Sequence, residues 1–337
     1  MATLYVFNPE HDLALASNLR NFTSPLAGRK MRAEKGWLPA IWASDSDFIL
    51  VEDATFAMDK WLNERERLGF GEASRQFVEK KVLSRLAIDK VDPWGWDLAI
   101  KYELIRHGVD ERLFPSDEAL EDIRQLSHRR TAVALLSRLE GQGLTGQSFE
   151  LKPTHEAWNR CQKGCGPCVY KAPWSSSGRG VRFFEGEMSD ADMKWVAHVI
   201  EQQGSVILEP YYNKVKDFGM EFYAHEDGSV EYLGLSVFET RNGTYLDNIV
   251  ALEEEKTSLL TPYVSADLLQ YVREEICRQM ASIINRKYVG CFGVDMMIVK
   301  GDDRFLVHPC VEVNLRRTMG WIALIPRFRG GLLLGNS

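Results

Sequence analysis

Three oxygen-bearing side chains near the end of the chain have the types and spacing of a divalent-cation site. Asp295 lies inside the apolar run GVDMMIV. Glu312 and Asn314 lie two residues apart in FLVHPCVEVNLR. Because successive side chains of a strand point to opposite faces, Glu312 and Asn314 share one face. Mg²⁺ prefers carboxylate and carbonyl oxygens and usually shares its shell with phosphates. The residues predict a Mg²⁺ site, with a surface hairpin of solvated charges as the alternative.

The elements that would position these ligands are two strands joined by a turn. The apolar run covers 293–299, KGDDR at 300–304 is a polar turn that contains glycine, and the second strand covers 305–316. If the hairpin pairs Asp295 with the face of Glu312, the three ligands converge beside the positive charges that follow the second strand. A phosphate-bearing ligand is the partner that such a cluster favours.

A second stretch combines a lysine with a turn of small residues. Lys171 lies in the strand-like CVYKAP, SSSGRG follows at 175–180, and VRFF reads as a returning strand. Backbone N–H groups of a serine-glycine turn can approach phosphate oxygens closely, and a lysine adds a point charge. The turn joins two strands and lacks the GxxxxGK[ST] order, so it is not a P-loop. An ordinary hairpin is the alternative interpretation.

Composition indicates a globular protein with more than one domain. The chain has 337 residues, an apolar share of 45%, a charged share of 26% and a net charge of −7. This length exceeds one hydrophobic core, so we expect two or three domains. The acidic balance gives no support to a nucleic-acid partner. No apolar run approaches the ~20 residues that span a bilayer, and no secretory signal pattern opens the sequence. We therefore expect a cytoplasmic protein with no membrane partner.

The cysteines allow two interpretations. Three of the six, Cys161, Cys165 and Cys168, cluster in CQKGCGPC, and a zinc site with His155 as fourth ligand would use them. The spacing is irregular and no second CxxC follows, which favours a turn with reduced thiols.

The first 125 residues or so alternate strand-like and helix-like patterns. Strands are predicted at 4–9 and around FILV, whereas 51–67, 72–87 and 94–109 have helical apolar spacing. This alternation predicts a small α/β domain with a largely parallel sheet, and no GxGxxG follows the first strand.

Polar residues directly after the first predicted strand are candidates for substrate contacts. Asn8 and His11 occupy this position, where open α/β sheets tend to bind ligands. A polar loop that caps the next helix is the alternative. The sequence leaves both interpretations open.

Later segments supply further elements. A helix is predicted at 188–204, with Ser189 or Asp190 as N-cap and Gly204 as its stop. VILEPYY at 206–212 reads as a strand, and antiparallel strands and a long amphipathic helix at 265–288 lead to the acidic hairpin.

The order of these features resembles the ATP-grasp superfamily. The residues that carry the resemblance are Lys171, Ser175 to Gly180, Glu209, Asp217 or Glu221, Asp295, Glu312, Asn314 and Arg316. The resemblance covers roughly residues 125 to 325. It implies an α/β and α+β fold, in which a small parallel-sheet domain precedes a two-lobed ATP-grasp fold with antiparallel sheets. The implied parts are an N-terminal domain at 1–125, a lobe with the serine-glycine loop at 126–205 and a lobe with the Mg²⁺ site at 206–337.

The resemblance implies that one set of residues contacts ATP through its phosphates, adenine or ribose. This set is Arg130, Lys171, Ser176, Ser177, Gly178, Gly180, Glu209, Pro210, Tyr211, Asp217 and Glu221. Superfamily members have a lysine where this chain has Arg129 or Arg130, and Arg130 is the residue assigned here. The choice between Asp217 and Glu221 stays open.

The resemblance also implies the reacting groups. Asp295, Glu312 and Asn314 would ligate one or two Mg²⁺ ions, or Mn²⁺ in their place. Arg316, together with Lys171, would stabilise the charge on the transferred phosphoryl group. Either Arg317 or Arg241 would hold a substrate carboxylate, because arginine forms bidentate pairs with carboxylates.

The implied activity is ATP-dependent ligation of a carboxylate and an amine through an acylphosphate, with a small substrate of amino-acid or peptide type. Two alternatives remain: a small-molecule kinase of the same fold, and a nucleotide-binding protein without turnover. Many superfamily members are dimers, so a homodimer is compatible with the resemblance.

Overall fold

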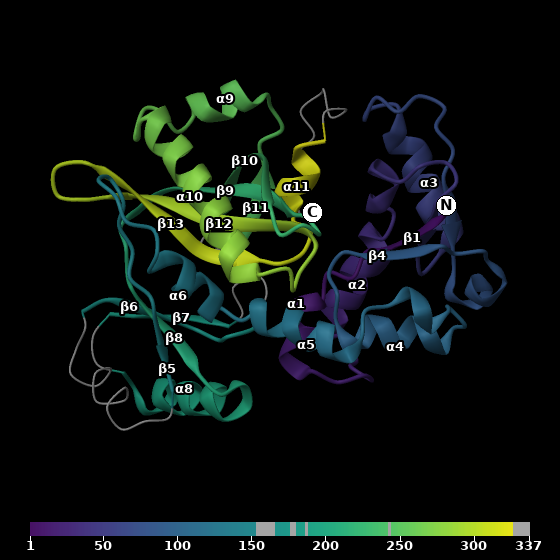
Figure 1. Ribbon diagram of the computed structural model, residues 1–337, viewed down its shortest axis with the longest axis horizontal. Coiled ribbons are helices and arrows are strands. Elements are labelled where there is room, and N and C mark those ends of the chain that lie inside the picture. Colours follow the sequence, from purple (N-terminus) through teal and green to yellow (C-terminus); the bar gives the residue numbers. More distant parts are fainter. Residues whose placement is uncertain (153–165, 176–179, 186–187, 242–243, 326–337) are drawn as a thin grey trace. The chain divides into compact units, whose positions relative to one another are not determined.

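The computed structural model describes residues 1–152, 166–175, 180–185, 188–241 and 244–325 (Figure 1). Within these ranges the side chains of 240–241 and 244–247 are not described. The described chain divides into two compact units, formed mainly by Met1–Arg124 and by Gln125–Leu324.

The first unit is built on a four-stranded parallel sheet. The strand order is β3-β2-β1-β4, and every neighbouring pair is parallel. The strands are β1 (Thr3–Val6), β2 (Phe48–Leu50), β3 (Gln76–Val78) and β4 (Lys90–Pro93). The α-helices of this part of the chain are α1 (His11–Ser17), α2 (Leu26–Lys35), α3 (Ala54–Arg65), α4 (Leu98–Arg106) and α5 (Asp117–Leu126). The predicted small α/β domain with a parallel sheet is confirmed.

Local capping and apolar packing explain these elements. Asp97 lies before α4, and its side chain accepts a hydrogen bond from the Ile100 backbone N–H, which satisfies a free donor of the first turn. Ile100 and Leu104 of α4 then pack into the same buried cluster as Leu4 and Val6 of β1. One buried cluster of this unit therefore joins β1 of the sheet to α4.

One predicted helix of this unit is wrong. Residues 72–87 form strand β3 and a 3₁₀ helix at Lys80–Arg85. Phe77 and Val78 pair in parallel with Ile49 and Leu50 of β2. Pairing along an existing sheet edge outweighs the weak helical spacing of so short a segment.

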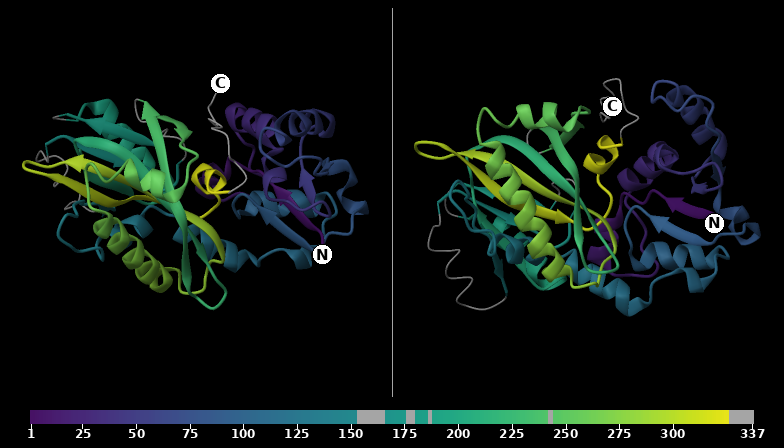
Figure 2. Two further views of the ribbon diagram at one scale, coloured as in Figure 1. Left: turned by 90° about the horizontal axis from the view of Figure 1, so that it is seen from above. Right: turned by 45° about the horizontal axis from the view of Figure 1, so that its top comes forward.

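The second unit contains two antiparallel sheets (Figures 1 and 2). The smaller sheet has the order β5-β8-β6-β7, with β5 (Phe149–Leu151), β6 (Cys168–Lys171), β7 (Val181–Phe184) and β8 (Val206–Pro210). Helix α8 (Asp190–Gln203) packs on it through Val196, Val199 and Ile200, and α6 (Arg130–Leu136) precedes β5. Ser189 caps α8 and Gly204 ends it in the left-handed conformation, as predicted.

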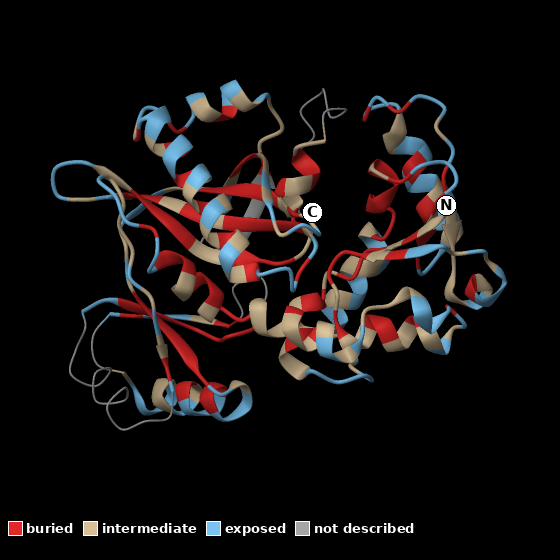
Figure 3. Cartoon of the chain, viewed as in Figure 1, coloured by how far each residue is buried: buried red, intermediate tan, exposed pale blue. Residues whose placement is uncertain are grey.

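The larger sheet has the order β11-β10-β9-β12-β13. Its strands are β9 (Lys214–Ala224), β10 (Val230–Arg241), β11 (Thr244–Asn248), β12 (Gly290–Lys300) and β13 (Phe305–Asn314). The helices of this part are α9 (Glu253–Ser258), α10 (Ala266–Ile284) and α11 (Met319–Ala323), and α10 packs on β9 and β10. Figure 3 shows that buried residues concentrate in the strands of this sheet. The predicted antiparallel lobes are confirmed.

None of the helices in the described ranges combines the length and the apolar character that crossing a bilayer requires.

Candidate active site

Strands β12 and β13 bring the predicted metal ligands together. They pair antiparallel, with Asp295 opposite Glu312 and Gly293 opposite Asn314. The Asn314 Nδ2 atom donates a hydrogen bond to Asp295 Oδ2 at 3.0 Å. The pairing on which convergence of the three ligands depends is therefore present.

Two acidic groups of this cluster have strongly raised pKa values. Burial raises the pKa of Asp295 to about 7, and the neighbouring Glu312 charge adds to the rise. On the adjacent strand β9, Glu221 lies opposite Gly293, and burial raises its pKa to about 8. The Glu221 Oε2 atom is buried and has no hydrogen-bond partner among the described residues. The cluster thus holds more negative charge than its surroundings stabilise.

Asp217 lies on the same strand as Glu221 but further from this end of the hairpin. Asp217 pairs in register with Met297, and its Oδ2 atom lies 2.6 Å from Lys214 Nζ. The Asp217 charge adds to the raised pKa of Asp295, and the Asp295 charge adds to the raised pKa of Glu221, which is buried. Of the two residues that the sequence left open, Glu221 lies in the cluster's buried part.

Arg129 and Arg130 point to different partners. Arg129 is buried, and its Nη1 atom lies 2.9 Å from Glu312 Oε2. Its Nε donates to the Ala172 carbonyl at 2.9 Å, and its Nη2 donates to Ser175 Oγ at 3.1 Å. Arg130 is partly exposed and donates from Nη2 to Glu150 Oε1 at 2.8 Å. Sequence reasoning assigned Arg130, whereas Arg129 is the residue that joins Glu312 to the base of the serine-glycine loop.

Lys171 and Glu209 form a buried ion pair. The Lys171 Nζ atom lies 2.6 Å from Glu209 Oε2, and it also donates to the Val311 carbonyl at 3.3 Å. Ser148 Oγ donates to the second oxygen of Glu209 at 3.1 Å. The contact to Val311 places Lys171 next to the strand that carries Glu312. Sequence reasoning placed both residues at the nucleotide but did not predict that they pair.

The residues after Glu209 are more accessible. Pro210 ends β8, and the Tyr211 backbone N–H donates to the Pro167 carbonyl at 2.8 Å. Tyr211 is 54% exposed, and its ring meets the Phe183 ring edge-on at 6.0 Å between centroids. An exposed aromatic ring beside a buried charged pair can stack on a flat ligand.

The arginines after β13 remain close to the cluster. Arg316 Nη2 donates to Asn314 Oδ1 at 3.1 Å, and Arg316 Nη1 donates to the Arg317 carbonyl at 3.2 Å. The Arg317 guanidinium lies over the Trp321 ring, 5.1 Å from its centroid. Arg316 therefore contacts a predicted metal ligand directly, whereas Arg317 packs on α11.

The base of the serine-glycine loop requires glycine at its end. The Gly180 carbonyl accepts a hydrogen bond from the Ala172 N–H at 2.7 Å. A Cβ atom at Gly180 would lie 2.3 Å from Ser175 Cβ, which is closer than real contacts allow. Ser176, Ser177 and Gly178 lie outside the described residues, as does the side chain of Arg241.

The other candidate sites have separate outcomes. Cys161, Cys165 and His155 lie outside the described residues, and Cys168 is a buried free thiol on β6. The described ranges contain no group of three His, Cys, Asp or Glu side chains that could hold a metal ion, and the predicted Mg²⁺ set has two carboxylates and one amide.

Asn8 and His11 belong to the first unit and meet at Asp97. Asn8 Nδ2 donates to Asp97 Oδ2 at 3.2 Å, and His11 Nδ1 lies 3.0 Å from the same oxygen. Both side chains are buried, and the N-cap residue of α1, Glu10, makes no side-chain capping hydrogen bond.

Comparisons with known proteins agree on the fold. No protein-family model and no curated protein sequence matches the chain. Among solved structures, the biotin carboxylase domain of the Hydrogenobacter thermophilus 2-oxoglutarate carboxylase, in complex with MgADP, ADP and bicarbonate, matches with a TM-score of 0.53 and 14% identity. That match covers 98% of this chain and 70% of the other.

Two further matches have lower TM-scores. N5-carboxyaminoimidazole synthetase from Staphylococcus aureus, complexed with ADP, gives 0.48 at 14% identity, over 98% of this chain and 78% of the other. The biotin carboxylase of Campylobacter jejuni gives 0.49 at 13% identity, over 97% and 71%. The parallel first sheet, the two antiparallel sheets and the match to the H. thermophilus domain lead to one conclusion: this chain has the ATP-grasp fold.

Proposed function

We propose that the protein is an ATP-dependent ligase that joins a carboxylate to an amine and releases ADP and phosphate. The observation that carries the proposal is the cluster on β12 and β13, where Asp295 faces Glu312 and Asn314 bonds to Asp295. The fold supports it, because the H. thermophilus domain of the same fold was solved with MgADP and bicarbonate.

The residues present fit a magnesium ion. Asp295, Glu312 and Asn314 supply hard oxygen donors, and burial together with the facing Glu312 charge raises the pKa of Asp295, which a bound cation would offset. Asn314 Oδ1 accepts a hydrogen bond from Arg316, so coordination through this oxygen would replace that bond. Mg²⁺ bound by this set would supply the positive charge that phosphate groups of ATP need during transfer.

The proposed nucleotide contacts surround the base of the serine-glycine loop. Lys171 and Arg129 are the buried cations there, each paired with a carboxylate, Glu209 and Glu312 respectively. Phosphate oxygens would compete with these carboxylates for the same N–H donors. Arg129 takes the place that sequence reasoning gave to Arg130, because Arg129 contacts the loop base at Ser175. Glu209, Pro210 and Tyr211 would border the adenine and ribose.

The proposed reaction has two steps. A carboxylate oxygen of the substrate forms a bond to the γ-phosphorus of ATP, and the bond from that phosphorus to the bridging oxygen breaks, which releases ADP. The amine nitrogen then bonds to the carbonyl carbon of the acylphosphate, phosphate leaves with the electron pair of the C–O bond, and the nitrogen loses a proton. Arg316 would stabilise the charge on the transferred group, and either Arg317 or Arg241 would hold the carboxylate.

The chain's part in this chemistry is positioning and charge compensation, which is how most phosphoryl-transfer sites work. We assign the 206–337 lobe to the metal and the 126–205 lobe to the phosphates. The N-terminal domain at 1–125 would supply substrate specificity. We propose a substrate of amino-acid or small-peptide type.

The test is a screen of amino-acid pairs with Mg·ATP, in which ADP, phosphate and the product mass are measured. Ligase activity predicts ADP and phosphate release that requires both a carboxylate and an amine, with a new amide product. A phosphorylated product without any amine requirement would instead show a kinase. ATP binding without turnover under every mixture would contradict both activities. Glu312→Gln should abolish release, whereas the exposed Glu201→Gln on α8 should not.

A further inference from the structure

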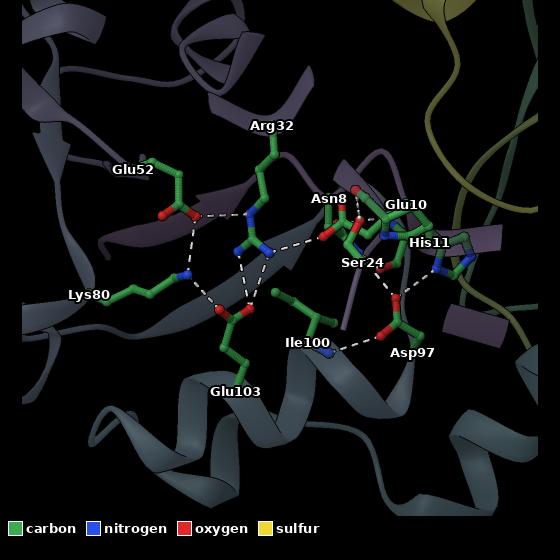
Figure 4. Close-up of polar contacts among 12 residues, drawn as sticks. Asn8, Glu10, His11, Ser24, Arg32, Glu52, Lys80, Asp97, Ile100 and Glu103 are labelled. Atoms are coloured by element: carbon green, nitrogen blue, oxygen red, sulfur yellow. Dashed lines mark hydrogen bonds and ion pairs between the residues drawn. The ribbon is translucent and has the colours of Figure 1, made fainter. Parts of the chain in front are cut away.

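A polar cavity of about 470 Å³ lies inside the first unit, which is a volume typical of small-molecule sites. Its lining comes from the segments that follow the four strands, and from α2 and α4. These segments include the carboxyl ends of parallel strands, where open α/β sheets bind ligands. Figure 4 shows the charged side chains that meet in and around it.

Arg32 is the centre of a charge network in this cavity. Its Nη1 lies 3.1 Å from Glu10 Oε1, its Nη2 lies 3.2 Å from Glu103 Oε2, and its Nε lies 3.6 Å from Glu52 Oε1 (Figure 4). Lys80 Nζ lies 3.1 Å from Glu52 and 2.6 Å from Glu103. Three carboxylates thus face two cations, so the network carries one excess negative charge.

Glu10 is the carboxylate of this network whose charge is least compensated. Its side chain lines the cavity and the residue is only 7% exposed. One carboxylate oxygen accepts from Arg32, but the other, Oε2, is buried without a hydrogen-bond partner in the described part of the chain. A buried acceptor without a donor costs about 1–3 kcal/mol. Burial also raises the pKa of Glu10, which shows that its surroundings compensate the charge incompletely.

Helix α2 approaches Glu10 closely because it carries a glycine at the contact. A Cβ atom at Gly28 would lie 3.3 Å from Glu10 Cβ and 2.4 Å from Ser24 Oγ. Because Glu10 lines the cavity and its Oε2 atom is buried without a partner in the described ranges, a molecule inside the cavity could supply the donor.

The exposed part of the lining carries a net positive charge. Two exposed cations, Arg29 of α2 and Arg106 of α4, line the cavity together with one exposed carboxylate, Glu52. Arg106 donates to Asn21 Oδ1 at 3.0 Å, whereas the Arg29 guanidinium has no partner in the described ranges. The cavity is therefore negative at its buried end and positive at its exposed end, and Phe22 and Ile100 add apolar lining.

We propose that this cavity binds an α-amino acid, with the ammonium group donating to Glu10 Oε2 and the carboxylate paired with Arg29. An ammonium group supplies both the missing donor and the missing positive charge, which a neutral ligand or an anion would not. The binding of an amino acid does not depend on the proposed ligase function. Only the identification of that amino acid as a ligase substrate rests on the proposed function.

The first test uses the unmodified protein without ATP. Calorimetry with the twenty protein amino acids, each also as its N-acetyl and its carboxyamide derivative, compares ligands that lack one charge. At least one amino acid should bind, its N-acetyl derivative at least tenfold more weakly, and its carboxyamide more weakly with less salt dependence. Binding by none of the twenty, or equal binding of the N-acetyl form, would overturn the proposal.

Matched variants locate the two contacts. Glu10→Gln should weaken binding at least tenfold and Arg29→Gln several-fold, whereas Glu34→Gln and Lys30→Gln, exposed changes on α2 outside the lining, should leave it unchanged. Circular dichroism checks that Glu10→Gln is folded. If this variant does not fold, the N-acetyl and carboxyamide series on the unmodified protein still tests the proposal. Equal effects of Glu10→Gln and Glu34→Gln would contradict the assignment.

The two proposals fail in different ways. An amino acid that binds with Glu10 dependence but is never ligated would leave this inference intact and contradict the ligase. If the protein forms an amide and Glu10→Gln leaves the KM for the amino acid unchanged, the ligase proposal would stand and this inference would be contradicted.

Discussion

Asp295 and Glu312 lie directly opposite each other on β12 and β13, and a third group compensates only one of them. Glu312 pairs with Arg129 at 2.9 Å, whereas Asp295 receives a hydrogen bond from Asn314. The residual negative charge is consistent with the raised pKa of Asp295. This asymmetry makes the cluster a site for added positive charge, and the predictions below follow from it and its surroundings.

Removal of the Glu312 carboxylate should remove most of the stabilisation by Mg·ADP. A ligand that binds only the folded state at 100 times its Kd stabilises by about 2.7 kcal/mol, so the unmodified protein should show a clear rise in Tm. Glu312→Gln should lose most of that rise, and Glu201→Gln should keep it. Thermal unfolding with and without Mg·ADP measures the difference, and an equal rise in Glu312→Gln would contradict the metal assignment.

Arg129 and Arg130 should differ in both stability and nucleotide binding. Arg129→Met leaves Glu312 without its partner, and breaking a largely buried pair costs on the order of 3–5 kcal/mol. Arg130→Met removes a partly exposed pair with Glu150, which contributes at most about 1 kcal/mol. Urea unfolding and ATP-analogue binding measure the two effects. Stronger loss of nucleotide binding in Arg130→Met would restore the assignment made from the sequence.

A substitution at Ser175 should restore part of the stability that a substitution at Gly180 removes. Gly180→Ala places a Cβ atom 2.3 Å from Ser175 Cβ and 2.5 Å from its Oγ, so we expect a cost of about 1–3 kcal/mol. Adding Ser175→Gly removes both atoms, although Ala172 Cβ at 3.0 Å remains close. The double variant should therefore recover much of the stability in urea unfolding. Additive losses would show that the clash is not the cause.

Glu221 should make the metal-free protein less stable as pH rises. Burial raises the folded-state pKa of Glu221 from 4.5 to about 8, so the native state binds more protons than the unfolded state between these values. The stability from the protonated form is therefore present below about pH 4.5 and is lost as pH rises towards 8. Glu221→Gln should remove a decline on the order of a few kcal/mol.

The control for this pH dependence is the exposed Glu226→Gln on the turn after β9. It should retain the full decline between pH 5 and 8 in urea titrations with a metal chelator present. A Glu221→Gln variant whose stability falls with pH as steeply as that of the unmodified protein would contradict the assignment.

The features that could be predicted from the sequence are those that depend on residues close together in the chain. The alternation of Glu312 and Asn314 predicted their common face, and the turn at 300–304 predicted the hairpin. The sequence left the pairing of Asp295 with that face as a condition, because the register shifts between Asp295 and Met297 and no local pattern predicts this shift. Ser189 and Gly204 marked the ends of α8 because capping is local. In contrast, three-residue β3 is too short for periodicity to separate it from a helix.

The parts that the sequence missed depend on contacts between distant residues. Successive residues of a helix point about 100° apart, so Arg129 and Arg130 face different surroundings. No local pattern at the start of the helix indicates which of the two arginines faces the interior. The pair of Lys171 and Glu209, and the network that joins Arg32 to Glu10 and Glu103, form only when separate elements pack.

The central claim is that a substrate carboxylate attacks the γ-phosphate of ATP, and oxygen labelling tests it most directly. A carboxylate substrate with both oxygens as ¹⁸O is ligated in the presence of Mg·ATP, and the released phosphate is analysed by mass spectrometry. The account predicts one ¹⁸O atom in each phosphate released, because the attacking oxygen leaves with phosphorus. Amide formation with unlabelled phosphate, or with the label in AMP, would contradict it.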